Sequence, residues 1–170
     1  MGIEFGLMIR GQFPREDDLA LRFEQICEQA RLADRLGFSC ITKGSHYGSA
    51  PMQDLAQIPF LSRIAAEAPN CRLNAGIVLL PLHKPLDVAE QIATLDVMSN
   101  GRAIFGCALG YRDVEFKAFG TRGEDRVARL EENLSAIKQL WTGEPVTMTG
   151  SHFELDHVAT STLPVQTPHP

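Results

Sequence analysis

The sequence predicts an α/β fold in which four parallel strands alternate with four helices. Short apolar runs suited to strands alternate with longer segments whose apolar residues recur every three or four positions, the period of an amphipathic helix. One run, AIFGCAL at residues 103–109, is apolar enough for a strand that is buried on both faces, as strands of parallel sheets are. Strict alternation favours parallel strands joined by right-handed crossovers, with the helices outside the sheet.

The first strand and helix are expected within the first 37 residues. Residues 3–9 form an apolar run suited to a strand, and residues 10–12 leave its carboxyl end. From about Asp17 the apolar residues follow a helical period until Gly37 stops the helix. An acidic first turn complements the dipole of this helix.

The second unit begins with a short strand at residues 38–42. Residues 43–57 are rich in Gly, Ser and Pro, so we expect a long loop there. Apolar positions at helical spacing then predict a helix over residues 58–68, which Pro69 ends.

The third and fourth units follow the same plan. Residues 71–80 form the third strand, and Pro85 fits the first turn of the next helix because its missing N–H has no helical partner there. Asn100-Gly101 supplies a positive-φ stop before the strand at residues 103–109. After a loop, the apolar period returns in a helix over residues 127–141.

We expect the chain to divide near Gly143. Residues 1–143 hold the alternating unit, and residues 144–170 hold a small hairpin and a Pro-rich tail. VTMT and HFEL flank Gly150-Ser151 and are suited to the two hairpin strands.

Composition places the chain among soluble globular proteins. It has 170 residues, 44% of them hydrophobic and 22% charged, which is enough for one domain with a core. A net charge of −5 argues against nucleic-acid binding. No run approaches the roughly 20 apolar residues that cross a membrane, and no signal peptide is visible, so we expect a cytoplasmic protein with no membrane partner.

The cysteines and histidines show no metal-binding pattern. There is no C-x-x-C pair, and Cys27, Cys40 and Cys107 fall at expected core positions, so buried reduced thiols are expected. The histidines outside residue 46 lack the spacing of metal ligands, so no metal site is expected.

One stretch resembles a known family. PLDVAEQIATLDVMSNGRAIFGCALGY, followed by EF, FG and LEENLSAIKQLWTG, is similar to the central signature of the bacterial luciferase-like monooxygenases, and weaker similarity covers nearly the whole chain. The resemblance implies a (β/α)8 TIM barrel that binds flavin mononucleotide (FMN) or the deazaflavin F420. Such barrels usually need about 250 residues. The chain therefore corresponds to the N-terminal half, with four β/α units plus the hairpin.

Half a barrel leaves two sheet edges with unpaired backbone groups. Three outcomes are open: the second half exists elsewhere, two copies associate into a homo-oligomer, or the chain is a shortened product that folds imperfectly.

Active sites of parallel barrels lie where the carboxyl ends of the strands meet the following loops. His46 is the sharpest candidate there, because an imidazole can hydrogen-bond a ligand and transfer a proton near neutral pH. The alternative is an ordinary surface histidine. The resemblance favours a catalytic or flavin-orienting role, since the family commonly has an acidic residue followed by His at this place. Ser45 stands where that carboxylate is expected, and a hydroxyl adds no charge.

Two further segments are candidates for cofactor binding. The resemblance implies a non-prolyl cis peptide at Gly76-Ile77 beneath the flavin ring; the alternative is a strand glycine that permits tight packing. At the end of the fourth strand it implies backbone contact with the ring from Ala108, Leu109, Gly110 and Tyr111. The alternative for this segment is an ordinary turn from strand to loop.

Charged residues of the signature are expected to be mainly structural. Asp96 and Arg102 lie on the side away from the strand ends, where pairing or capping is expected. Glu115 is expected in the loop above residues 103–109, where it is either solvated or reaches the site.

The resemblance implies an oxidoreductase for a small organic substrate. Reduced FMN would activate oxygen for monooxygenation, or F420 would exchange a hydride, and FMN is the first choice. Barrels of this kind hold phosphate on the loops after strands seven and eight, which belong to the second half. Since the four units seen here do not include those loops, the alternative is a non-catalytic half-barrel that self-associates or partners another chain.

Overall fold

A four-stranded parallel sheet is the centre of the computed structural model, which describes residues 2–170. The strands follow the order β1-β3-β5-β6: β1 Gly6–Met8, β3 Cys40–Lys43, β5 Arg72–Leu79 and β6 Ala103–Ala108. The crossover helices are α1 Leu19–Arg35, α2 Gln57–Glu67, α3 Pro85–Met98 and, after β6, α5 Arg126–Leu140. The predicted parallel α/β arrangement is confirmed. The sheet is open and no barrel is closed within these residues.

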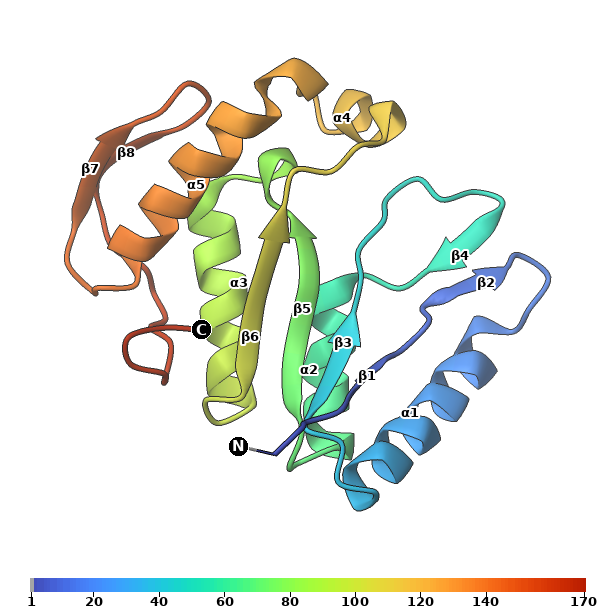
Figure 1. Cartoon of the computed structure of the whole chain (residues 1–170). Coiled ribbons are helices and arrows are strands. Elements are labelled where there is room, and N and C mark those ends of the chain that lie inside the picture. Colours follow the sequence, from blue (N-terminus) through green and yellow to red (C-terminus); the bar gives the residue numbers. More distant parts are fainter. Residues whose placement is uncertain (1) are drawn as a thin grey trace.

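The helices cover one face of the sheet. Figure 1 shows α2 and α3 behind the strands and no helix in front of them. The residues that point toward the helices, such as Ile41 and Leu73, are fully buried against Leu61, Ile64 and Ile92. Their neighbours along the strands face the uncovered side and are less buried. The expectation that β6 is buried on both faces is therefore wrong, because most of its residues are only half-buried. The apolar core therefore lies between the sheet and the helices.

A two-stranded antiparallel ribbon lies where the sequence predicts a loop. It joins β2 Gln12–Pro14 to β4 Met52–Asp54, so the expectation of an uninterrupted loop over residues 43–57 is wrong. Each strand has only three residues, and Phe13 pairs with Gln53, forty positions away. No local pattern reveals such a short, long-range pairing. Figure 1 places the ribbon beyond the carboxyl ends of β1 and β3.

The segment after β6 also differs from the expected loop. It forms the short helix α4 Asp113–Ala118, followed by one 3₁₀ turn at Gly123–Asp125; another 3₁₀ turn, Leu80–Leu82, follows β5. Six residues do not complete two helical turns, so a periodic pattern cannot identify α4. Helix α4 places Glu115 in the interior instead of in a solvated loop.

The predicted hairpin is present and lies outside α5 (Figure 1). Its strands are β7 Val146–Thr149 and β8 Glu154–Val158, so the second strand begins and ends later than the HFEL segment suggests. Val146 and Leu155 are buried and join the main core. This packing connects the hairpin to the α/β unit.

Arg102 and Asp96 have the structural roles that the sequence predicts. Arg102 donates from Nη2 to the Ala65 carbonyl at 3.0 Å and from Nη1 to the Ala68 carbonyl at 2.9 Å, which caps the carboxyl end of α2. Asp96 is fully buried and accepts hydrogen bonds from Ala103 N–H and from the tail residue Gln166. The two residues therefore fasten the base of the sheet.

All four cysteines are free thiols. Cys27 is buried as predicted, but Cys40 and Cys107 are only half-buried, because they sit in strands whose second face is uncovered. Cys71 is buried, although the sequence did not single it out as a core residue. Burial, with the nearby Asp34 carboxylate, raises the pKa of the Cys71 thiol to about 11.

We expect Cys71 to react with iodoacetamide at least about a hundredfold more slowly than free cysteine near pH 8. An ordinary thiol has a pKa of about 8.5, so the thiolate fraction of Cys71 is far smaller at that pH. Timed alkylation followed by peptide mass spectrometry measures the rate, with the half-buried Cys40 as the internal comparison. Equal rates for Cys71 and free cysteine would contradict the expectation.

Within residues 2–170, none of the helices combines the length and the apolar character that a membrane crossing requires.

Candidate functional site

His46 lies in the loop after β3, at the carboxyl edge of the sheet. It lines two adjoining cavities with volumes of about 320 and 220 Å³. The first cavity lies over the ends of β1 and β3, and the second lies between the β2–β4 ribbon and the loop after β6. Their walls are formed by Met8, Ile9, Arg10, Gly11, Gln12, Lys43, Gly44, Ser49, Met52, Asp54, Tyr111 and Arg112. The ends of β1 and β3 and the loop after β6 thus meet around His46, whereas no residue of β5 lines either cavity.

The carboxylate partner of His46 comes from helix α4. Glu115 is 2% exposed, and its Oε1 lies 3.3 Å from His46 Nδ1. The carboxylate that is missing at position 45 is thus supplied by a residue 69 positions after His46. The choice between a solvated and a buried Glu115 could not be made from the sequence, because α4 is too short to show a buried face. The one available signal was its position just beyond a strand end.

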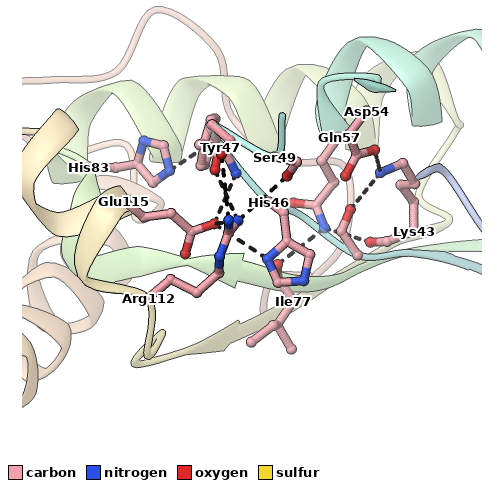
Figure 2. A network of polar contacts seen from close by, with 12 residues as sticks. Lys43, His46, Tyr47, Ser49, Asp54, Gln57, Ile77, His83, Arg112 and Glu115 are labelled. Atoms are coloured by element: carbon pink, nitrogen blue, oxygen red, sulfur yellow. Dashed lines mark hydrogen bonds and ion pairs between the residues drawn. The ribbon is translucent and has the colours of Figure 1, made fainter. Parts of the chain in front are cut away.

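Arg112 was not among the residues identified from the sequence. It is the N-cap residue of α4 and donates from Nη1 to Glu115 Oε1 at 3.2 Å and to the Tyr47 carbonyl at 3.0 Å. The Tyr47 N–H donates to the same Glu115 oxygen at 2.9 Å. Figure 2 shows the His46 ring, Arg112 and the Tyr47 backbone around Glu115.

The peptide bond between Gly76 and Ile77 is cis, as the resemblance implies. The register between β5 and β6 shifts between Ala75 and Val78, so these two residues form a bulge in β5. The Ile77 side chain is 39% exposed. A Cβ on Gly76 would come within 2.7 Å of the Asn74 side chain, so any larger residue here would force that side chain to move.

The segment after β6 turns sharply at Gly110, which has φ of +75°. Other residues rarely adopt this conformation, so the turn itself accounts for the glycine. Tyr111 beyond it is 78% exposed, and its ring centroid lies 6.4 Å from that of His46. Ala108 and Leu109 lead into the turn and are partly buried. Their contact with a cofactor remains a prediction.

A buried ion pair forms the floor next to His46. Lys43 Nζ lies 2.7 Å from Asp54 Oδ1, and the two side chains are 3% and 6% exposed. The pair joins the end of β3 to strand β4 of the ribbon. Gln57, at the start of α2, donates to the carbonyls of Lys43 at 2.5 Å and Ile77 at 3.3 Å, and so links this floor to the β5 bulge (Figure 2).

A second histidine lies behind this network. The hydroxyl of Tyr47 lies 3.3 Å from His83 Nε2, and both rings contact Phe119. Burial lowers the pKa of His83, with Asp87 opposing the change, and burial raises the pKa of the Tyr47 hydroxyl. His83 is therefore neutral near pH 7, and its Nε2 can accept a hydrogen bond from the Tyr47 hydroxyl.

The contact with Glu115 determines which ring nitrogen of a neutral His46 carries the proton. With Nδ1 of His46 facing a carboxylate, a neutral ring carries its proton on Nδ1 and leaves Nε2 as an acceptor. The neighbouring bulge offers an apolar, partly exposed side chain at Ile77. An imidazole beside an apolar surface suits a flat heterocyclic ligand whose reaction involves proton transfer.

Comparisons with known proteins agree with this picture. The profile of the family described as luciferase-like monooxygenase matches residues 3–170. Limonene 1,2-monooxygenase of Rhodococcus erythropolis is 29% identical, over 89% of this chain and 39% of that protein. The oxygenase component of flavin-dependent trigonelline monooxygenase of Acinetobacter baylyi is 30% identical, over 87% and 41%.

Further similarity includes a dehydrogenase and a crystal structure. F420-dependent hydroxymycolic acid dehydrogenase of Mycobacterium tuberculosis is 28% identical, over 86% of this chain and 42% of that protein. The monooxygenase RslO1 of Streptomyces bottropensis superposes with a TM-score of 0.87 at 31% identity, over 99% of this chain and 52% of that chain. The chain thus spans about two fifths of the length of the curated relatives it matches.

Proposed function

Since the chain belongs to the luciferase-like monooxygenase family, we propose that it forms the His46 side of the active site of a flavin- or F420-dependent oxidoreductase that acts on a small organic molecule. The observation that carries the proposal is the contact between His46 and the buried Glu115 carboxylate at the mouth of the cavities. The contact fixes the orientation of the His46 ring at the edge of the cavities, which a freely rotating surface histidine would lack.

The residues around the β5 bulge fit a flat ring system. Ile77 presents an apolar side chain, and Gly110 lets the backbone after β6 turn close to the site. Asn74 Oδ1, on the same strand as the bulge, is buried and has no hydrogen-bond partner among residues 2–170. We therefore assign Gly76, Ile77 and residues 108–111 to the surface that would hold the cofactor ring.

Each polar residue has a separate task in this proposal. The cofactor supplies the redox chemistry when it is bound. His46 Nε2 accepts or returns a proton on the substrate side, because Nδ1 is engaged by Glu115. The Lys43–Asp54 pair holds the β2–β4 ribbon against the site, where the ribbon lines one of the cavities beside His46.

The open sheet supports the placement of this chain as the N-terminal half of a (β/α)8 barrel. One face of the sheet is uncovered, and strands β1 and β6 each have one edge without a strand partner among the described residues. A second half, supplied by further chain or by another copy, would cover that face. In barrels of this kind it also brings the loops that bind phosphate.

FMN is our first choice of cofactor, and F420 is the alternative. The named relatives include a flavin-dependent and an F420-dependent enzyme at similar identity, 30% and 28%. The common requirement is a flat ring with an exposed reactive centre, which both cofactors meet. We also propose that the substrate is a small molecule and that copies of the chain associate into a homo-oligomer.

Cofactor titration tests the proposal directly. We expect FMN or F420 fluorescence to change saturably when the full chain is added, and Ile77→Asp to weaken binding at least about tenfold, because it puts a charge beneath the ring. Val97→Asp is the matched control, since Val97 is similarly exposed but lies at the far end of α3. No binding of either cofactor, or equal effects of the two variants, would favour a non-catalytic half-barrel.

A further inference from the structure

Three donors converge on a single oxygen of Glu115. His46 Nδ1, the Tyr47 N–H and Arg112 Nη1 lie 3.3, 2.9 and 3.2 Å from Oε1. The carboxylate is almost completely buried, and such a group is stable in the interior only when cations and hydrogen-bond donors surround it. Arg112 is the guanidinium that pairs with it, and its own side chain is 27% exposed. Glu115 therefore depends on Arg112 for its charge partner.

The side chains of Glu115 and Arg112 bind the backbone N–H and the backbone carbonyl of Tyr47, respectively. Glu115 accepts from the Tyr47 N–H, while Arg112 Nη1 donates to the Tyr47 carbonyl at 3.0 Å. Arg112 also reaches Ser49 Oγ and the Gly48 carbonyl, both at 3.5 Å. The loop that carries His46 is thus fixed to the start of helix α4, and a fork with several N–H groups is needed to reach these acceptors.

We infer that Arg112 is a positioning residue that holds the loop of residues 46–49 and the Glu115 carboxylate in one arrangement, and so keeps the proton of the neutral His46 ring on Nδ1. Nε2 then remains an acceptor that faces the ligand side. The use of this acceptor in catalysis rests on the proposed function, whereas the clamp itself requires no cofactor. Its effect on His46 is indirect, because Arg112 acts through Glu115 and the backbone.

Other charged and titratable groups also surround His46. They come from every element packed against the site: Arg10 after β1, Lys43 at the end of β3, Asp54 in β4, Tyr111 after β6, and Arg112 and Glu115 at helix α4. Lys43 and Asp54 pair with each other at 2.7 Å, so their charges largely cancel. Glu115 is the group that contacts the imidazole directly.

The clamp is tested on the cofactor-free chain labelled with ¹⁵N. Long-range ¹H–¹⁵N spectra near pH 8 report which ring nitrogen of His46 carries the proton, and amide exchange reports the Tyr47 N–H. In Arg112→Gln we expect Tyr47 exchange to rise at least about tenfold, because a charge-assisted contact is lost. The Nδ1-protonated population of His46 should fall at least about twofold.

Two further variants make the result decisive. Arg112→Lys keeps the charge without the fork, so both readouts should lie between those of the native chain and Arg112→Gln. Arg122→Gln is the matched control, since Arg122 is exposed and its ion-pair partners among residues 2–170 are its neighbours Glu124 and Asp125. It should change neither readout. Unchanged readouts in Arg112→Gln, or equal changes in Arg122→Gln, would overturn the inference.

A general loss of structure is distinguished by the rest of the spectrum. If Arg112→Gln does not fold, Arg112→Lys decides: faster exchange confined to residues 46–49 supports the clamp, and faster exchange throughout the core, for example at Leu73, overturns it. Cofactor titration of the same variants separates the two proposals. A native chain that binds neither FMN nor F420 but shows the expected tautomer refutes the proposed function and leaves the clamp in place.

Discussion

Replacing Lys43 by methionine is expected to lower the free energy of unfolding by about 3–5 kcal/mol. Lys43 and Asp54 are 3% and 6% exposed, and their charged atoms are 2.7 Å apart. Methionine fills most of the volume of lysine but leaves the Asp54 carboxylate buried without its cation. An uncompensated buried charge is costly, so the loss should exceed that of an ordinary core substitution.

Urea denaturation followed by circular dichroism measures this effect. Arg22→Met is the control, because Arg22 and Asp17 form an ion pair that is 42% and 20% exposed and should contribute less than about 1 kcal/mol. The double variant Lys43→Met with Asp54→Leu removes both charges and should recover most of the stability. A loss in Lys43→Met no larger than in the control would show that the pair is solvated.

The ion pair also bears on the site. Asp54 belongs to the ribbon, and Lys43 ends the strand that leads to His46. Loss of the pair should therefore loosen the β2–β4 ribbon before it affects the core. Faster amide exchange in residues 52–54 than in Ile41 would be the sign of this local opening.

The regular elements were predictable because their patterns are local. The stripe of α3 and the run AIFGCAL each report a buried face within a dozen residues, and the positions of α3 and β6 agree with the structure. The β2–β4 ribbon and α4 are too short to repeat a pattern. They are stabilised by contacts distant in sequence, such as Lys43 with Asp54, which no propensity reports.

The site was predictable to the same extent. Family resemblance pointed to His46 and to the cis peptide at Gly76-Ile77. The structure places His46 at the carboxyl edge of the sheet and the cis peptide in the bulge within β5. The family pattern has a carboxylate directly before the His, but this chain has Ser45 there; the carboxylate partner comes instead from Glu115 through tertiary packing. Arg112 gave no signal, since an arginine at the start of a short helix is ordinarily a surface residue.

Substituting Asp96 by alanine is expected to lower the free energy of unfolding by about 3 kcal/mol and to release the tail. The buried carboxylate accepts from the N–H groups of Ala103 at 3.2 Å, Val165 at 2.7 Å and Gln166 at 3.0 Å, and from the Gln166 side chain at 2.7 Å. Alanine leaves the Ala103 N–H unsatisfied at the base of β6. The tail amides can recover their hydrogen bonds only by moving into water.

The two consequences need separate measurements. Urea denaturation gives the loss of stability, and limited proteolysis with mass spectrometry shows whether residues 160–170 become accessible. Asp96→Asn should lower the free energy of unfolding about half as much as Asp96→Ala. The amide oxygen of asparagine can still accept from the donors of one carboxylate oxygen, whereas its NH₂ group replaces the other oxygen and cannot accept. Asp156→Ala on the exposed face of β8 should change neither readout. Normal stability together with an unchanged digestion pattern in Asp96→Ala would mean that the tail is held by other contacts, such as that of the His169 ring with Trp141, whose centroids are 5.5 Å apart.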